Sequence, residues 1–304
     1  MAHRSNWKPT LESVLKAAHS PVLKEIACIV GSPPLMLPSA SMFMEFSSLE
    51  HLLEAFHNDL PSLEWPPPNE QEILGTKNIR LGNRFEKMLL WWLKRSDHFE
   101  VLASNLVIQG DQHTLGEMDL ILENKFSGER VHLELACKFY LNASSSREWN
   151  QWIGAHSIDR LDIKINKLRR QLNLRMHPQT EQVLRKNDCM IQRSTALMKG
   201  WFFYHFRDLA SPVRPLHSNP NAPSGWWCHY SDWKHIWTSH AHWILIQPEH
   251  WLRIRHHSNL SPLITPYGWK MERQQLVAQV EWQNQEWVEL NRGMIVYDGW
   301  PMKT

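Results

Sequence analysis

Residues 131 to 140 alternate between two kinds of side chain, and this ten-residue pattern constrains the fold more than any other feature of the chain. One set is Val131, Leu133, Leu135, Cys137 and Phe139, and the other is His132, Glu134, Ala136, Lys138 and Tyr140. Successive side chains of a strand point to opposite faces of its sheet. The pattern therefore predicts a strand with one apolar face and one face that carries both charges.

The segments around this strand complete a compact α/β unit. Apolar periodicity and turn residues predict a helix at 82–95, strands at 100–109, 117–123 and 130–141, and a helix at 157–174. We expect this unit to form the core of the protein.

The chain is long enough for additions on both sides of that core. With 304 residues, of which 42% are hydrophobic and 17 are Trp, it can bury a substantial interior. We expect three regions: a helical N-terminal cap at 1–75, the core at 76–178, and a Trp-rich α+β extension at 179–304.

Two stretches outside the core have distinctive composition. Leu60 to Glu70 contains three consecutive prolines after Trp65, which predicts a stiff connector that is neither helix nor central strand. In the C-terminal region, strands are expected at 201–206 and 242–246, with a loop at 214–225 between them.

Composition narrows the class of protein without naming a partner. The formal net charge is +2 with 18 His, which neither demands nor excludes nucleic acid. The four cysteines lie far apart without a CxxC pair, so we expect reduced thiols. No apolar run approaches the roughly 20 residues that span a bilayer, and the first residues lack a secretory signal, so the cytoplasm is the expected compartment.

An acid on the preceding strand supplies the candidate chemistry. Asp119 begins an apolar run, and it can stand beside Glu134 if the two strands pair. Two converging carboxylates repel each other unless a cation compensates, and a hard divalent ion with oxygen ligands fits that role. We therefore expect Mg²⁺ or Mn²⁺ at Asp119 and Glu134. Such an ion binds a scissile phosphate and activates water, while a nearby lysine, here Lys138, orients that water or stabilises the transition state.

These residues, taken in order, resemble a known superfamily. Gly82-Asn83-Arg84-Phe85-Glu86, Asn105, Gly116-Glu117-Met118-Asp119-Leu120-Ile121, Leu133-Glu134 and Lys138 are similar to the PD-(D/E)xK nucleases, in particular to Holliday-junction-resolvase-like proteins. The resemblance covers about a third of the chain. It implies a restriction-endonuclease-like core, a mixed sheet flanked by helices. It also implies that Glu86 is a helix acid that contacts the metal directly or through water, that Asp119 and Glu134 are metal ligands, and that Lys138 is the motif lysine.

The lysine departs from the superfamily pattern. It normally follows the second acid by two residues, where this chain has Ala136. Lys138 keeps the same strand face but lies about 6 to 7 Å further along. This departure leaves open the alternative that the chain is a catalytically inactive derivative of such a nuclease. The whole chain also resembles an uncharacterised bacterial family assigned to the same superfamily.

The helix that follows the strand carries a basic face. Its apolar stripe is Ile158, Leu161, Ile165, Leu168 and Leu172, and another face groups Arg160, Lys164, Lys167 and Gln171. This basic ridge is a candidate for binding nucleic-acid phosphates, although an amphipathic helix commonly turns such charges to solvent.

Plainer interpretations exist for each feature. The face with Glu134 and Lys138 could be an ordinary solvated face with a cross-strand ion pair. Seven histidines between 229 and 257 lack the spacing of an HExxH or paired CxxC zinc motif. The tryptophans of the C-terminal third could stack on bases, but such aromatics more often pack in a core. The chain contains no GxSxG motif, so the sequence gives little support for a serine hydrolase.

The leading expectation is a metal-dependent nuclease acting on DNA. The alternative is a catalytically inactive nuclease-fold protein that binds nucleic acid or a protein partner. A third hypothesis, a purely structural interaction protein, predicts no salt-dependent affinity for nucleic acid.

Overall fold

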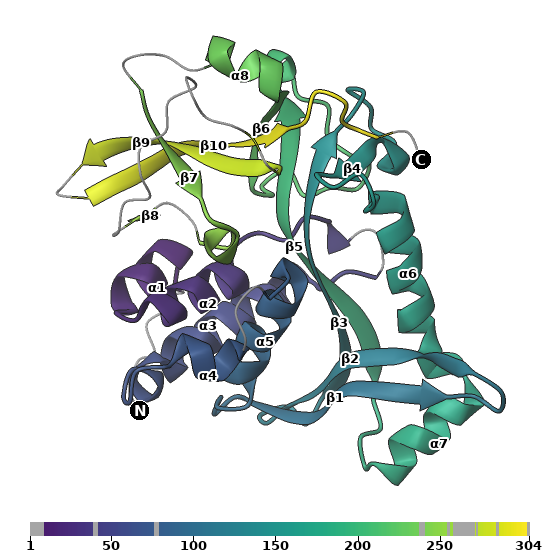
Figure 1. The fold of residues 1–304 in the computed structure, drawn as a ribbon. Helices are drawn as coiled ribbons and strands as arrows, with labels where there is room; N and C mark the ends of the chain where they lie inside the picture. Colours follow the sequence, from purple (N-terminus) through teal and green to yellow (C-terminus); the bar gives the residue numbers. More distant parts are fainter. Residues whose placement is uncertain are drawn as a thin grey trace. The chain divides into compact units, whose positions relative to one another are not determined.

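The computed structural model describes residues 9–38, 42–75, 79–236, 241–253, 256–257, 271, 273–283 and 286–302 (Figure 1). The chain divides into two compact units. The first comprises Met1–Ser32, Pro38–Ala136 and Arg169–Leu197, and the second comprises Pro33–Leu37, Cys137–Leu168 and Met198–Thr304. The expected α+β class, a mixed sheet flanked by helices, is confirmed. The division passes through two strands, which contribute residues to both units.

The N-terminal part of the first unit is helical. Its helices are α1 (Leu11–Ala17), α2 (Pro21–Gly31), α3 (Phe46–Leu63), α4 (Glu70–Leu74) and α5 (Leu81–Leu93). Thr10 caps α1 by accepting a hydrogen bond from the Ser13 amide, and Ser20 caps α2 in the same way through Val22. In α2, eight of eleven residues are buried, so this helix is a core element.

The buried side chain of Arg84 links three of these helices through two ion pairs. Arg84 of α5 donates to Glu25 of α2 at 2.7 Å and to Glu70 of α4 at 2.9 Å. Although burial opposes its charge, the two carboxylates hold the pKa of Arg84 above its usual value. Removing either partner of such a pair leaves a buried charge, so the pair fixes how these helices pack.

The predicted connector is partly wrong. Helix α3 continues through Pro61 to Leu63 instead of ending at Leu60, because Leu60 and Leu63 belong to its buried face. The backbone amide of Glu64 closes the last turn on the Leu60 carbonyl. The three prolines that follow do separate α3 from α4.

The first unit also holds a strand hairpin and its neighbour. Strands β1 (Phe99–Gln109), β2 (Thr114–Asn124) and the first half of β3 (Arg130–Asn142) pair antiparallel in that order. Helix α7 (Pro178–Lys186) packs on the hairpin, where a core cluster contains Ile108, Met118, Ile121, Leu184 and Cys189. These strands lie within three residues of their predicted bounds.

The second unit contains a mixed sheet. Its strands are the second half of β3, β4 (Trp152–Gly154), the second half of β5 (Arg193–His205), β6 (Ser224–His229), β7 (His242–Ile246), β8 (His256–His257), β9 (Gln275–Gln283) and β10 (Glu286–Val296). Strands β5, β6 and β10 are parallel neighbours, whereas β9 pairs antiparallel with both β10 and β7. Helix α8 (Tyr230–Ile236) follows β6. Short 3-10 turns occur at Trp149–Gln151, Leu174–Met176, Phe206–Asp208 and Pro248–His250.

Tryptophans of the C-terminal region pack in its core. Trp226, Trp233 and Trp243 are buried together with Cys228, Val277 and Ile295, and Trp227 is also buried. Core packing is therefore confirmed for these four. Trp237 lies outside the described residues.

Helix α6 (Leu161–Asn173) begins four residues later than predicted. Ser157 has a φ of 61°, which is incompatible with a right-handed helix. Leu161, Ile165, Leu168 and Leu172 form the expected buried stripe, but Ile158 precedes the helix and is 83% exposed. Its assignment to the apolar stripe was therefore wrong.

None of the described helices has the length and apolarity needed to cross a bilayer. All four cysteines are free thiols with buried side chains.

Candidate functional site

Asp119 and Glu134 converge where β2 and β3 separate. The ladder between these strands ends at the pair Leu120 and Leu133. One residue beyond it, a carboxylate oxygen of Asp119 accepts a hydrogen bond from the Leu135 amide at 2.8 Å. The Asp119 amide in turn donates to Glu134 Oε1 at 3.4 Å. The two acids thus replace the backbone ladder with side-chain bonds and lie next to each other, as the sequence predicted.

Glu134 is fully buried and paired with a histidine. His132 Nε2 lies 2.8 Å from Glu134 Oε1, and both side chains have no exposed area. His132 Nδ1 lies 3.1 Å from the Ser194 hydroxyl of β5. The other carboxylate oxygen, Glu134 Oε2, is buried without a hydrogen-bond partner among the described residues. A buried carboxylate oxygen without a donor is costly unless a proton or a cation satisfies it.

His132 is the site residue that sequence reasoning missed. The alternation of β3 placed it on the face of Glu134, but gave no sign that this part of the face is buried. A signal was present in the two-residue spacing, because His132 and Glu134 are same-face neighbours on one strand. That spacing brings the imidazole against the carboxylate.

Asn105 lies on β1, opposite Asp119 of β2. It falls between the registered pairs Ser104–Leu120 and Leu106–Met118, with a φ of 52°. The left-handed region is uncommon for residues other than glycine, although Asn tolerates it better than most. Strained backbone of this kind concentrates at functional sites, and here it lies beside a candidate ligand.

The end of α6 reaches β2 near Asp119. Gln171 donates from its side-chain amide to the Glu117 carbonyl at 3.4 Å, and its Oε1 is buried without a hydrogen-bond partner in the described part of the chain. At Gly116, an added Cβ would lie 2.7 Å from Leu174 Cδ1, so the Leu174 side chain packs directly against the β2 backbone at this glycine. Gln171, which is expected to bind nucleic acid, therefore contacts β2 at Glu117, two residues before Asp119.

The other candidate residues have varied surroundings. Glu86 is partly buried on α5, in the same unit as Asp119, Glu134 and Gln171. Lys138 belongs to the second unit and forms an ion pair with Asp159 at 2.8 Å.

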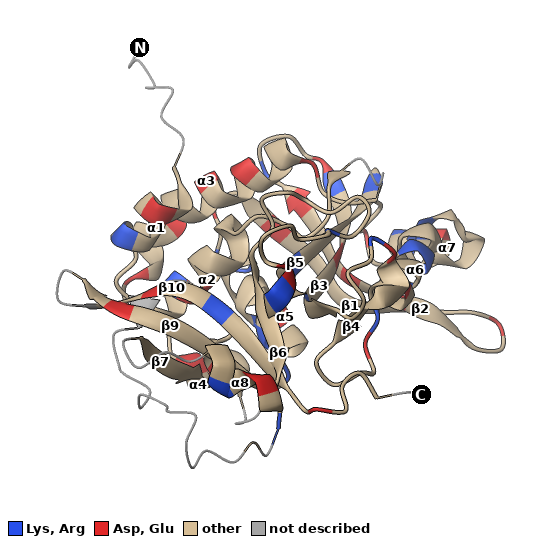
Figure 2. Ribbon diagram, turned by 90° about the horizontal axis from the view of Figure 1, so that it is seen from above, with Lys and Arg blue, Asp and Glu red and all other residues tan. Residues whose placement is uncertain are grey.

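The basic ridge is less continuous than the sequence suggested. Arg160 precedes α6 and pairs with Asp162 at 2.6 Å, which lowers the pKa of that carboxyl group. Lys164 is partly exposed and Lys167 is exposed on the helix. Basic residues of α6 are visible in Figure 2.

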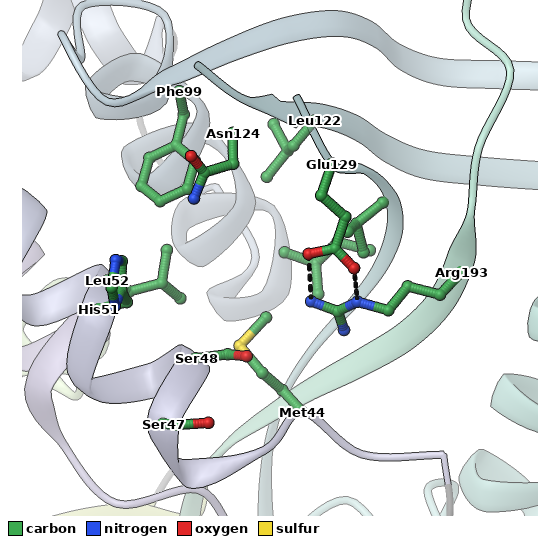
Figure 3. Close-up of a pocket in the computed structure, with 12 residues that line it drawn as sticks. Met44, Ser47, Ser48, His51, Leu52, Phe99, Leu122, Asn124, Glu129 and Arg193 are labelled. Atoms are coloured by element: carbon green, nitrogen blue, oxygen red, sulfur yellow. Dashed lines mark hydrogen bonds and ion pairs between the residues drawn. The ribbon is translucent and has the colours of Figure 1, made fainter. Parts of the chain in front are cut away.

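A pocket of about 250 Å³ lies on the opposite face of β2 and β3 (Figure 3). Leu122, Val131 and Leu133 contribute to its wall, and these side chains belong to the face that Glu134 does not occupy. Glu129 and Arg193 form a 2.6 Å ion pair at its edge. The pocket is therefore separate from the two carboxylates.

Among the site residues of the first unit, Asp119 and Glu134 have the chemistry to hold a hard divalent ion. Both carry carboxylate oxygens, the two residues are hydrogen-bonded to each other, and Glu134 Oε2 has no donor among the described residues. Oxygen ligands of this type suit Mg²⁺ or Mn²⁺.

Comparison with known proteins supplies a family but no activity. A family model described as a domain of unknown function (DUF1853) matches residues 24–296. No curated protein and no solved structure matches the chain.

Proposed function

Because the chain belongs to the DUF1853 family, whose description gives no activity, we propose a function from the site itself: a metal-dependent nuclease that hydrolyses phosphodiester bonds, with DNA as substrate. The observation that carries the proposal is that Asp119 donates its amide to Glu134 Oε1, while the other oxygen of the same carboxylate, Oε2, is buried without a donor among the described residues. A divalent cation satisfies that oxygen and relieves the repulsion between the acids.

The protein holds at least one oxygen of each carboxylate. The Leu135 amide holds Asp119, and His132 holds Glu134 Oε1. These bonds fix the orientation of both carboxylates. The Glu134 side chain therefore cannot rotate freely, and Oε2 keeps one position. His132 is a positioning residue in this scheme, since it acts through Glu134, in the way that partners of metal ligands commonly do.

A bound Mg²⁺ or Mn²⁺ supplies Lewis-acid activation of water and neutralises charge that develops on the phosphate. The chain supplies the ligands Asp119 and Glu134. By its resemblance to PD-(D/E)xK nucleases, Glu86 contributes a further acidic contact and Lys138 a cationic one. Arg160, Lys164, Lys167 and Gln171 are proposed to bind the nucleic-acid backbone. The four free thiols suit a reducing compartment such as the cytoplasm.

A second candidate function follows from the lysine. Ala136 occupies the usual lysine position, and Lys138 is bound to Asp159 at 2.8 Å. A nuclease fold with its lysine engaged in this way would bind nucleic acid or a protein partner without cutting it.

Cleavage assays separate the two functions. Labelled single-stranded, duplex and branched DNA, and RNA, are incubated with the protein in Mg²⁺, Mn²⁺ or EDTA. The variants are Asp119→Asn, Glu134→Gln and Lys138→Ala. Glu100→Gln is the matched control, because Glu100 is an exposed carboxylate on the neighbouring strand β1. Circular dichroism and melting temperature verify that each variant folds.

The nuclease proposal predicts metal-dependent cleavage that falls by about 100-fold or more in the Asp119 and Glu134 variants and persists in Glu100→Gln. If the wild type cuts no substrate but binds one with a steep dependence on salt, the second function holds and the enzyme proposal fails. Lys138→Ala tests the motif lysine: an unchanged rate assigns Lys138 to its ion pair with Asp159 alone.

A further inference from the structure

Two histidines and an aspartate come together in the second unit. His205 is the last residue of β5, His229 is the last residue of β6, and Asp232 lies in the first turn of α8. One ligand atom from each lies within 4.8 Å of the other two. None of the three belongs to the nuclease-like constellation, and a sequence motif could not reveal them because they come from three different elements.

Strand pairing explains why the histidines meet. Strands β5 and β6 are parallel, with His205 beside Trp227. His229 follows Trp227 by two residues and therefore points to the same face. The buried Trp227 ring contacts both imidazoles, with ring centroids 4.7 Å from His205 and 5.2 Å from His229. This packing limits the freedom of both histidines.

The hydrogen bond of His229 fixes its tautomer. His229 Nε2 lies 2.9 Å from the backbone carbonyl oxygen of Trp300. A carbonyl oxygen accepts only, so Nε2 must carry the proton, and in the neutral ring Nδ1 holds the lone pair. Histidines that bind metals commonly donate their other ring nitrogen to a carbonyl or carboxylate. His229 therefore has Nδ1 available as its ligand atom.

Asp232 supplies an anionic oxygen. Its side chain is 22% exposed, and Arg207 donates to Oδ1 at 3.1 Å. The Arg207 side chain is 66% exposed, so an ion at this carboxylate competes with a weak, solvated ion pair and not with a buried one.

We propose that His205, His229 and Asp232 form a binding site for a divalent transition-metal ion, with Zn²⁺ as the best occupant. Imidazole nitrogens favour zinc over magnesium, so this site is distinct in chemistry from the carboxylates of the first unit. Zinc bonds of about 2.0 to 2.1 Å place tetrahedral ligand atoms roughly 3.3 Å apart, so the ligand atoms would need to approach by at most about 1.5 Å on binding. Three protein ligands leave the fourth position for water, which is the arrangement of catalytic zinc sites.

Zinc titration of the chelator-stripped full chain tests the site. His229→Gln removes the ligand while its side-chain amide can still donate to the Trp300 carbonyl, and Asp232→Asn removes the charged oxygen. His235→Ala is the control, because His235 is an exposed histidine on the same helix as Asp232. Binding is measured by calorimetry with excess Mg²⁺ present, and Co²⁺ is added separately to record its visible absorption bands. Melting temperatures in EDTA show whether the variants fold.

The proposal predicts one Zn²⁺ per chain, a melting temperature raised by zinc, and intense tetrahedral Co²⁺ bands. Both site variants should bind Zn²⁺ at least about tenfold more weakly, and the control should match the wild type. The proposal is overturned if the wild type binds no zinc in excess Mg²⁺, or if folded His229→Gln and Asp232→Asn retain wild-type affinity. Should the variants fail to fold, wild-type Co²⁺ bands without nitrogen-ligated, tetrahedral character would also overturn it.

Discussion

Replacing Lys199 with methionine should stabilise the protein at neutral pH and flatten its pH dependence. Lys199 lies on β5 and is only 2% exposed. Burial lowers the pKa of its ammonium group to about 7, with a smaller opposing effect from Cys137. Methionine keeps an unbranched stem of similar length without a charge to bury.

The magnitude follows from the difference between the folded pKa of about 7 and the ordinary value of 10.5. Between these values the unfolded chain binds the proton and the folded protein does not, so stability rises with pH across this window and levels off above it. The full difference is worth on the order of 5 kcal/mol at about 1.4 kcal/mol per pH unit. Between pH 7.5 and 9.5 the contribution of Lys199 is about 2 to 3 kcal/mol.

Urea unfolding followed by tryptophan fluorescence, at pH 7.5 and 9.5, measures this contribution. The wild type should gain about 2 to 3 kcal/mol more than Lys199→Met between the two pH values. Equal pH dependence in the two proteins would refute the reasoning, since it would mean that Lys199 keeps its ordinary pKa when folded.

Three further substitutions test the packing around the site. His132→Leu should lower the free energy of unfolding by about 3 to 5 kcal/mol by leaving Glu134 unpaired, and the double variant with Glu134→Leu should recover part of this loss in urea titrations. Gly200→Ala should cost several kcal/mol or prevent folding, because the new Cβ would lie 1.8 Å from the Lys138 carbonyl oxygen; a soluble variant with wild-type melting temperature would contradict this close approach. Asn105→Val should lower the free energy of unfolding by about 1 to 2 kcal/mol and Asn105→Gly by much less, because the φ of 52° disfavours a β-branched residue. Equal melting temperatures for the two variants would show that the backbone is not strained there.

Local patterns predicted the strands of the first unit well. The predicted strand at 130–141 is β3 at Arg130–Asn142, and the hairpin before it also lies where turn residues place it. Alternation is a local property, so it can be read from neighbouring residues alone. The expectation that Asp119 stands beside Glu134 is also met, since β2 and β3 pair antiparallel up to Leu120 and Leu133.

Features that depend on distant contacts were missed or misplaced. Strand β5 begins at Arg193, whereas the sequence predicted a strand from Trp201. The first half was missed because Lys199 and Gly200 interrupt the apolar run of the strand. Only the close approach to β3 explains why a glycine with a φ of 134° stands at position 200. The cluster of His205, His229 and Asp232 likewise depends on which strands become neighbours, and sequence spacing does not reveal that.

The most direct test of the central claim is to locate a cation at Asp119 and Glu134. Crystals of the protein soaked in Mn²⁺ would be measured at a wavelength that gives anomalous signal from manganese, alongside crystals of Glu134→Gln. The account predicts a peak within about 2.2 Å of an Asp119 oxygen and of Glu134 Oε2 in the wild type, and its loss in the variant. An ordered pair of carboxylates with no manganese peak at saturating Mn²⁺ would contradict it.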